Sequence, residues 1–275
     1  MTSGDQFRSP PFPKFDTEEY AREFNEVYDK GGDGIVTPTT RTEDETDMGI
    51  FWAYDGVPTL CAPPRLYNYI ILHIAKQKKT SMLDMLRLLT IENVAMADAA
   101  IAAWDTKYFY RIWRPVVGIN QASGDPFTNE TTPYGSNQLI TIAEQAKGNF
   151  LPIFSPLGAP STNGNGPNFT PPFPAYVSGH AVFGGTVFQI LRDFYGTDDI
   201  PFTFVSDELN GQTLDNHGNV RPLKPRSFAN LKAAEYENAK SRIYLGIHWD
   251  IDSTEGIKMG HKVGALALDN LYRKK

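Results

Sequence analysis

Hydrophobic residues recur every three or four positions along most of this chain, which is the spacing of amphipathic helices. Residues 16–19, which begin with an aspartate, have the spacing of a capping box, so they predict the start of a first helix that Gly31 ends. Residues 42–45 have the same spacing and predict a second helix, closed at Gly56. The proline pair that starts at Pro63 predicts the first turn of a third helix.

The longest stretch without proline or glycine runs from Ser81 to about Trp113. It is rich in alanine, leucine and methionine, so we expect a core helix that ends ahead of Pro115, because the residue before a proline avoids helical geometry. Residues 120–175, in contrast, carry many prolines and glycines without sustained periodicity and predict a long irregular loop. Loops of that length in a compact domain are usually either walls of active sites or disordered segments.

Helical spacing returns in three later stretches, at residues 180–194, 228–246 and 253–271. In the first of them Gly184 and Gly185 leave room for the close approach of a neighbour. Strand-like alternation is scarce, so the fold prediction is all-α, with helices packed as a bundle. We expect one helical domain over residues 1–275, with residues 1–49 as an N-terminal lead-in and residues 50–275 as the bundle that carries the site.

The formal net charge of -6 narrows the class of partner. Nucleic acids and anionic membrane surfaces recruit proteins through excess positive charge, so we expect neither, and a small molecule is the predicted partner. Cys61 is the only cysteine, which excludes an intrachain disulfide and a multi-thiolate metal site. No apolar run is long enough for a membrane span, and the first residues lack the core of a secretory signal, so we expect a soluble chain, cytoplasmic or exported by another route.

Three separated segments each carry groups suited to binding a tetrahedral oxyanion. They are KYFYRIWRP at residues 107–115, SGH at residues 178–180 and SRIYLGIHWDID at residues 241–252. Together they supply three candidate cations, a glycine-flanked turn and two imidazoles. Their order and separation favour one converging anion site.

In the first segment, Lys107 and Arg114 stand seven residues apart, nearly two helical turns, so we expect both side chains on one face of the helix. Arg111 either joins them or pairs with Asp105 or Glu92. For any single one of these cations, a solvated helix surface is the ordinary alternative.

In the second segment, Ser178 and Gly179 precede a predicted helix, so their N–H groups lie at a helix N-terminus, which favours anions. The Ser178 hydroxyl can donate a hydrogen bond, Gly179 lets the backbone approach a ligand, and His180 exchanges protons near neutral pH. The alternative is a serine N-cap followed by a helix-start histidine.

In the third segment, Arg242 offers a planar fork for two oxyanion oxygens. His248 follows a glycine that permits a turn and is a candidate metal ligand or nucleophile. Asp252 comes one helical turn later, where it can orient the imidazole ring. The alternative is a buried structural histidine beside Trp249.

Together these segments resemble the signature of the vanadium-dependent haloperoxidases and of the related phosphatidic acid phosphatase type 2 superfamily: Lys, six residues, Arg-Pro, then Ser-Gly-His, then Ser-Arg with a downstream His and Asp. Three flanking stretches resemble the chloroperoxidase branch, namely WAYDG at residues 52–56, APPRLYN at 62–68 and FPAYVSGHA at 173–181. The resemblance runs from about residue 50 to residue 255. It implies a helical bundle of the acid phosphatase and vanadium haloperoxidase type.

The resemblance also implies vanadate as cofactor, with hydrogen peroxide and chloride or bromide as substrates and hypohalous acid as product. It assigns the equatorial vanadate oxygens to Lys107, Arg114, Ser178, Gly179 and Arg242. It assigns vanadium itself to His248, the proton on the opposite side to His180, and polarisation of bound peroxide to Lys107. In this scheme the metal acts as a Lewis acid.

By the same resemblance, Trp104 and Phe173 match apolar positions on the halide side of chloroperoxidases. Relatives that prefer bromide often carry a histidine where Phe173 stands, so the resemblance favours chloride competence with bromide also accepted. Asp55 is expected to pair with Arg114 or Arg242 and to fix its geometry.

The chain departs from the family pattern in two ways. Val177 stands where many relatives have a proline, which removes no ligand. Relatives of this branch usually carry a further helical region ahead of the matching part, where this chain has residues 1–49. We therefore expect either a compact or truncated form or a partner chain over an exposed face, and an apolar face left bare favours homo-oligomers or aggregation.

Two other functions fit the same residues. An acid phosphatase would use the same cations, with His248 as the phosphorylated nucleophile and His180 as the general acid. Trp104 and Phe173 favour the peroxidase, because a small cationic phosphatase pocket has less need of an apolar wall. A non-catalytic oxyanion-binding remnant is the third interpretation.

Overall fold

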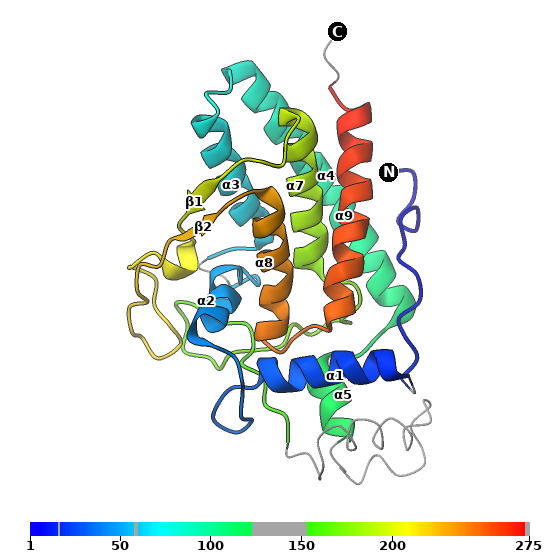
Figure 1. Ribbon diagram of the computed structural model, residues 1–275, viewed down its shortest axis with the longest axis vertical. Helices are drawn as coiled ribbons and strands as arrows, with labels where there is room; N and C mark the ends of the chain where they lie inside the picture. The colour runs from blue at the N-terminus through cyan, green and yellow to red at the C-terminus, as the bar shows by residue number, and fades with distance from the viewer. Residues whose placement is uncertain (16, 58–59, 123–152, 273–275) are drawn as a thin grey trace.

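The computed structural model describes residues 1–15, 17–57, 60–122 and 153–272 (Figure 1). Its long helices stand side by side, and α1 (Glu18–Gly31) lies across one end of them. These helices are α3 (Pro63–Gln77), α4 (Met82–Tyr110), α7 (Gly179–Tyr195), α8 (Leu231–Tyr244) and α9 (Asp250–Asn270). The all-α prediction is confirmed.

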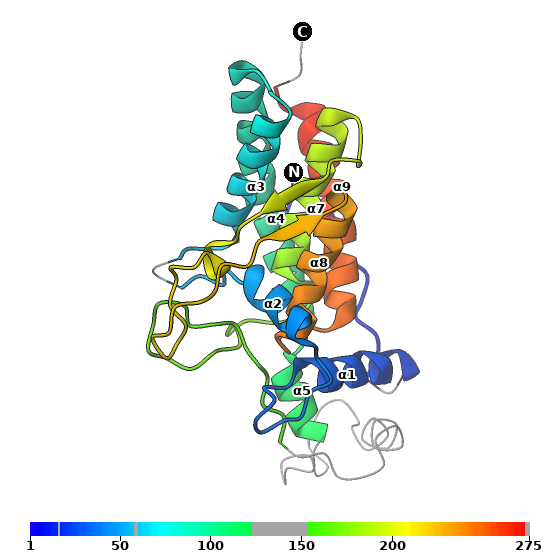
Figure 2. The same ribbon diagram turned by 60° about the vertical axis from the view of Figure 1, so that its left-hand side comes forward.

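Short elements complete the described fold. Helices α2 (Glu43–Phe51) and α5 (Pro115–Ala122) lie near the α1 end, and a 3-10 turn spans Asp207–Leu209. In the described ranges the strands are β1 (Phe202–Phe204) and β2 (Arg226–Phe228), an antiparallel pair with Phe202 opposite Phe228. This ribbon crosses the bundle beside α3 and α8 (Figure 2).

Helix α7 is the centre of the core, and it packs against α3, α4, α8 and α9. Two glycines permit this packing: a Cβ added at Gly184 would lie 2.3 Å from Asn238 Nδ2, and one at Gly185 would lie 2.8 Å from the Ile257 carbonyl oxygen. The close approach predicted at Gly184 and Gly185 is confirmed. In the ranges that the structure covers, no helix combines the length and apolar character needed to cross a bilayer.

The helix starts differ slightly from the sequence-based expectations. Thr17 caps α1 by accepting a hydrogen bond from the Tyr20 N–H, whereas Asp16 lies outside the described residues. The second capping box is confirmed, with Thr42 and Glu45 each accepting from the other's N–H. Helix α2 then ends at Phe51.

The predicted extension of the long helix to Trp113 is wrong. Ser81 caps α4, but the helix ends at Tyr110. Arg111 takes a left-handed conformation with φ 55°, and its N–H closes the last turn on the Lys107 carbonyl. Residues 112–114 are therefore non-helical when the chain enters α5 at Pro115.

Three other boundaries are corrected. The loop predicted at 120–175 begins only after the end of α5. Its residues 123–152 lie outside the described ranges. Residues 153–178 are irregular, with an isolated bridge between Ala159 and Phe169. Helix α8 begins at Leu231 rather than at residue 228, because Phe228 pairs in β2 and Asn230 supplies the N-cap. Helix α9 begins at Asp250, three residues earlier than expected.

Candidate functional site

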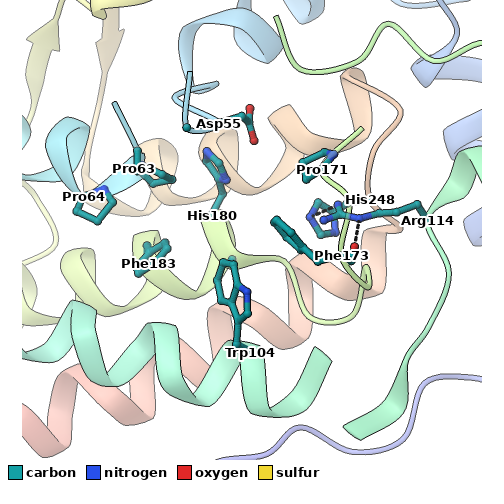
Figure 3. A pocket seen from close by; sticks show the side chains of 13 residues that line it. Asp55, Pro63, Pro64, Trp104, Arg114, Pro171, Phe173, His180, Phe183 and His248 are labelled. Carbon is teal, nitrogen blue, oxygen red and sulfur yellow. Dashed lines mark hydrogen bonds between the residues drawn. The ribbon is translucent and has the colours of Figure 1, made fainter. Parts of the chain in front are cut away.

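A cavity of about 290 Å³ opens at the N-terminal end of α7, where α4, the segment after α2 and the loop before α7 converge (Figure 3). Residues from all three sequence segments line it. Among its lining side chains are Asp55, Trp104, Arg114, Phe173, His180 and His248.

Lys107 is fully buried at the C-terminal end of α4. Its Nζ donates to the Pro174 carbonyl at 2.9 Å and to the Ala175 carbonyl at 2.8 Å. Burial lowers the pKa of Lys107 well below its usual value and the charge of Arg114 lowers it further, whereas Asp252 opposes the shift. The solvated-surface alternative is therefore wrong for this residue.

Arg114 reaches the same place from outside the helix. Its Nε donates to the Phe173 carbonyl at 2.8 Å, and its Nη1 lies 2.8 Å from both the Ile247 carbonyl and His248 Nε2. The expectation that Lys107 and Arg114 share a helix face is wrong, because α4 ends before Arg114. They meet because backbone carbonyls of residues 173–175 accept hydrogen bonds from both side chains.

Arg242, near the end of α8, is the third buried cation. Its Nη1 lies 3.0 Å from both carboxylate oxygens of Asp55, which confirms Arg242, rather than Arg114, as the partner of Asp55. The third candidate of the first segment, Arg111, is exposed and donates to the Tyr108 carbonyl. Neither of the two carboxylates expected to pair with Arg111 is placed to do so: Asp105 accepts hydrogen bonds from Arg8, and Glu92 is buried.

Several donors of these cations have no acceptor within the part of the chain that the structure describes. Arg114 Nη2 and both Nε and Nη2 of Arg242 are buried without a hydrogen-bond partner among the described residues. A buried donor without an acceptor costs about 1–3 kcal/mol, so an oxyanion that accepts from all three is strongly favoured here. The described residues hold no cluster of three or more His, Cys, Asp or Glu side chains suited to a metal cation. The arrangement is that of an anion site.

The N-terminus of α7 adds backbone donors to the cavity. Ser178 is the N-cap, and its Oγ lies 3.4 Å from the Ala181 N–H while its own N–H donates to the Asp252 carbonyl. The first N–H groups of a helix have no intrahelical acceptor, so those of Gly179 and His180 suit an anion. A Cβ at Gly179 would lie 3.2 Å from the Trp104 indole, which explains why a glycine stands here.

His248 is held by its two ring nitrogens. Nδ1 lies 2.7 Å from Asp252 Oδ2, and Nε2 lies 2.8 Å from Arg114 Nη1. Because a guanidinium only donates, Nε2 accepts and the ring proton sits on Nδ1. Asp252 Oδ2 also accepts the Trp249 N–H at 3.0 Å, so the carboxylate orients the ring as expected.

The same environment keeps His248 neutral. Burial lowers its pKa well below the usual value, and the charges of Arg114 and Lys107 lower it further. Burial raises the pKa of Asp252, opposed by the charge of Lys107. A neutral ring with an unprotonated Nε2 is the form that binds a metal or attacks phosphorus.

His180 lies on the other side of the cavity, on the first turn of α7. Its Nε2 donates to the Ala53 carbonyl at 2.5 Å, and Arg242 Nη1 lies 3.2 to 3.3 Å from the two ring nitrogens. Burial and the charge of Arg242 lower its pKa to about 4. Nδ1 is thus the nitrogen that can accept a proton.

Sequence reasoning missed two residues that hold His180. The Asn238 side-chain amide donates to the His180 carbonyl at 2.9 Å, and the Tyr67 hydroxyl lies within donating distance of that carbonyl, at 3.0 Å, and of Asn238 Oδ1, at 3.1 Å. Tyr67 lies within the family-like stretch at residues 62–68, which was a signal for it. Nothing in the sequence around Asn238 pointed to this role, because the contact depends on Gly184.

The buried His180 predicts a pH dependence of folding stability. Its pKa of about 4 in the fold lies below the usual 6.5, so the unfolded chain binds the proton first as the pH falls. The site therefore loses stability from about pH 6.5 down to about pH 4, by up to about 1.4 kcal/mol per pH unit. We expect the free energy of unfolding, measured by urea denaturation, to fall between pH 7 and pH 4 by up to about 3 kcal/mol more in the wild type than in His180→Gln. The same pH dependence of the free energy of unfolding in both proteins would contradict this.

Comparison with known proteins shows what the chain is similar to. Residues 87–274 match the sequence profile of the VCPO second helical-bundle domain. A vanadium chloroperoxidase from Curvularia inaequalis is 34% identical over 275 aligned positions, covering 86% of this chain and 41% of that protein. The structure of the first bacterial vanadium-dependent iodoperoxidase matches 99% of this chain and 55% of its own, with 28% identity and a TM-score of 0.70.

A holo-type bacterial vanadium-dependent chloroperoxidase shares the fold, with 17% identity and a TM-score of 0.65 over 96% of this chain and 50% of that one. These matches confirm the resemblance noted in the sequence and the type of helical bundle that it implied. The chain spans about half the length of the relatives it matches, with shares of 41%, 55% and 50%.

Proposed function

Since this chain belongs to the family of the VCPO second helical-bundle domain, we propose that it is a vanadate-dependent haloperoxidase. In this proposal it oxidises chloride or bromide with hydrogen peroxide to hypohalous acid. The observation that carries the proposal is the set of buried donors on Arg114 and Arg242 that find no acceptor among the described residues, beside the unprotonated Nε2 of His248.

Vanadate fits these residues. Its oxygens would accept from Arg114 Nη2, from Arg242 Nε and Nη2, and from Lys107, the Ser178 hydroxyl and the Gly179 N–H. His248 Nε2 would bind vanadium in exchange for its hydrogen bond to Arg114, which keeps the Ile247 and Phe173 carbonyls as acceptors. When bound, vanadate supplies a Lewis acid that activates hydrogen peroxide without changing oxidation state.

The protein's own groups then have separate tasks. Asp252 fixes the tautomer and the direction of the His248 ring, as carboxylates do for metal-bound histidines. Asp55 and the carbonyls of residues 173–175 hold the cations in place before any ligand arrives, so little reorganisation is needed. His180 is neutral above about pH 4 and accepts a proton at Nδ1.

The apolar wall of the cavity supports a halide as the second substrate. The rings of Trp104 and Phe173 lie 5.2 Å apart between centroids, and Lys107 Nζ lies 5.7 and 5.2 Å from them. Arg114 lies 4.9 Å from the Phe173 ring. A weakly hydrated anion suits a position between aromatic edges and a buried cation.

Phe173→His tests this wall. A histidine there brings a polar group and water next to Lys107, so a bound halide stays more hydrated, and this slows the oxidation of chloride more than that of the more easily oxidised bromide. We expect the ratio of chlorination to bromination to fall about tenfold, equal to about 1.4 kcal/mol. Steady-state rates with each halide measure it, and Phe169→His, outside the cavity lining, is the control. An unchanged ratio would remove Phe173 from the halide side.

The acid phosphatase alternative uses the same cations, and one experiment separates the two. Purified protein is given hydrogen peroxide, bromide and a β-diketone probe with and without orthovanadate, and in parallel an aryl phosphate. The proposal expects vanadate-dependent halogenation. Hydrolysis of the aryl phosphate that vanadate inhibits, without halogenation, would instead favour the phosphatase, and the absence of both reactions would favour a non-catalytic oxyanion-binding chain.

A further inference from the structure

Residues 8–13, which we name the N-terminal strap, lie against the C-terminal end of α4. Arg8 anchors the strap there, since it donates two hydrogen bonds to Asp105, at 2.9 and 2.7 Å, and lies 3.9 Å over the Phe109 ring. Figure 1 shows the chain continuing alongside the bundle to the start of α1. The strap lies outside residues 87–274, the part that matches the family profile, so the family match by itself assigns it no role.

The sequence of the strap makes it stiff. Residues 9–13 read SPPFP, and their prolines fix φ at about -65° and hold the preceding residues extended. A segment restricted in this way loses little conformational entropy when it is held in place. Because prolines have no backbone N–H, Pro10 and Pro11 offer carbonyl groups alone to their neighbours. The strap is therefore suited to act as a fixed row of acceptors.

Two tyrosines donate to consecutive carbonyls of the strap. Tyr110, the last residue of α4, donates its hydroxyl to the Ser9 carbonyl at 2.9 Å. Tyr176, from the loop before α7, donates to the Pro10 carbonyl at 2.6 Å. The Tyr176 ring is fully buried and lies 5.5 Å from the Phe12 ring and 5.6 Å from that of Tyr110. A hydroxyl on a buried ring is costly without an acceptor, so the strap determines where this side chain lies.

Tyr176 directly follows the three carbonyls that hold two of the buried cations. The carbonyls of residues 173–175 accept hydrogen bonds from Arg114 and Lys107. The last of these carbonyls, that of Ala175, and the Tyr176 N–H belong to one planar peptide unit, because the two residues are neighbours. A restraint on Tyr176 is therefore also a restraint on an acceptor of Lys107.

The Ala175 carbonyl helps to set the direction of the Lys107 ammonium. A protonated lysine has three N–H groups, and those of Lys107 donate to the Pro174 carbonyl at 2.9 Å and to the Ala175 carbonyl at 2.8 Å. Because the nitrogen is tetrahedral, two fixed N–H groups determine the direction of the third. If the Ala175 carbonyl moved away, the buried ammonium would lose an acceptor and turn more freely.

We propose that Tyr176 is a positioning residue for the anion site and that the N-terminal strap holds it in place. Its hydrogen bond to the Pro10 carbonyl fixes the peptide unit that accepts from Lys107. The strap thereby helps to preorganise the cations before an anion arrives. The step from a fixed loop to vanadate binding rests on the proposed function, whereas the fixing of the loop does not.

Hydrogen exchange in the vanadate-free protein tests the positioning. Tyr176→Phe keeps the ring and removes the hydroxyl, so we expect the Ala175 amide, which donates to the Ile112 carbonyl, to exchange about fivefold faster. Tyr110→Phe is the matched control, because it removes a hydrogen bond to the same strap from a helix residue instead of the loop. It should change the Ala175 rate by less than about twofold. No change in Tyr176→Phe, or an equal increase in both variants, would overturn the proposal.

Orthovanadate titration by calorimetry tests the consequence for the site. The dissociation constant should rise about fivefold in Tyr176→Phe and stay at the wild-type value in Tyr110→Phe, because Tyr176 alone of the two adjoins a carbonyl that Lys107 uses. An unchanged dissociation constant in Tyr176→Phe, or an equal rise in both variants, contradicts the positioning role. If the wild type binds no orthovanadate, the proposed function fails, and the exchange rate of the Ala175 amide still decides the role of Tyr176.

A double-mutant cycle tests the route through the strap. Pro11→Gly, at an exposed position, removes the restraint on φ next to Pro10 and should speed exchange of the Ala175 amide by about twofold or more. In the Tyr176→Phe background the same change should have no further effect, since the strap no longer holds the loop. Effects that add, or no effect of Pro11→Gly in the wild-type background, would show that the strap does not act through Tyr176.

Discussion

Replacing His248 by alanine is expected to reduce vanadate-dependent halogenation to the level without vanadate, a loss of about 1000-fold or more. The Nε2 atom of His248 faces the cations without a proton. Asp252 holds the ring proton on Nδ1, and burial lowers the pKa of the imidazole. The rate at saturating halide and peroxide measures the loss. Orthovanadate binding, measured by calorimetry, should weaken in parallel.

Two further variants distinguish a loss of catalysis from a loss of folding. His248→Gln keeps a polar side chain near Asp252 and should also be inactive while retaining the wild-type circular dichroism spectrum. His217→Ala removes an exposed histidine outside the cavity and should leave the rate unchanged. Halogenation retained in a folded His248→Gln protein would refute the role of this ring.

Replacing Arg242 by alanine is expected to lower the free energy of unfolding by about 3–5 kcal/mol, because it leaves the carboxylate of Asp55 buried without its partner. The same change removes two of the buried donors that await an anion, so orthovanadate should no longer raise the melting temperature. Chemical denaturation with and without orthovanadate measures both effects.

A double-mutant cycle separates the charge from the packing. Asp55→Ala in the Arg242→Ala background should recover a large part of the lost stability, since no unpaired charge then remains. Arg22→Ala, at an exposed arginine whose ion pair with Glu18 spans 4.0 Å, should stay within about 0.5 kcal/mol of wild type. If Arg242→Ala costs no more than Arg22→Ala, Arg242 is not the buried anchor described here.

The sequence predicted the helices well where local signals determine them. The capping box at Thr42 stands where expected, and Ser178 caps α7 as the alternative interpretation of the second segment held, because such side chains act on the nearest N–H groups. The helix end near Trp113 was wrong because the left-handed turn at Arg111 has no strong local signal. A proline at position 115 bounds a helix without fixing its last residue.

The site was predictable in its membership but not in its geometry. The spacing from Lys107 to Arg114 suggested one helix face, whereas the two side chains meet through backbone carbonyls of a loop that lies 59, 67 and 68 residues away in sequence. The pairing of Asp55 with Arg242 was one of two expected alternatives, and the fold decides it by placing Arg242 Nη1 3.0 Å from both carboxylate oxygens of Asp55. Contacts that depend on tertiary packing, such as that of Asn238 with the His180 carbonyl, have no local sequence pattern.

The most direct test of the central claim is the rate of bromide oxidation as orthovanadate is titrated into the vanadate-free protein. If the three buried cations and His248 form a vanadate site that oxidises halide, the rate starts at background and rises with each addition. It then reaches a plateau at about one equivalent per chain, as one-site saturation requires. A rate that is independent of orthovanadate, or that stays at background when calorimetry shows the site filled, would contradict the account.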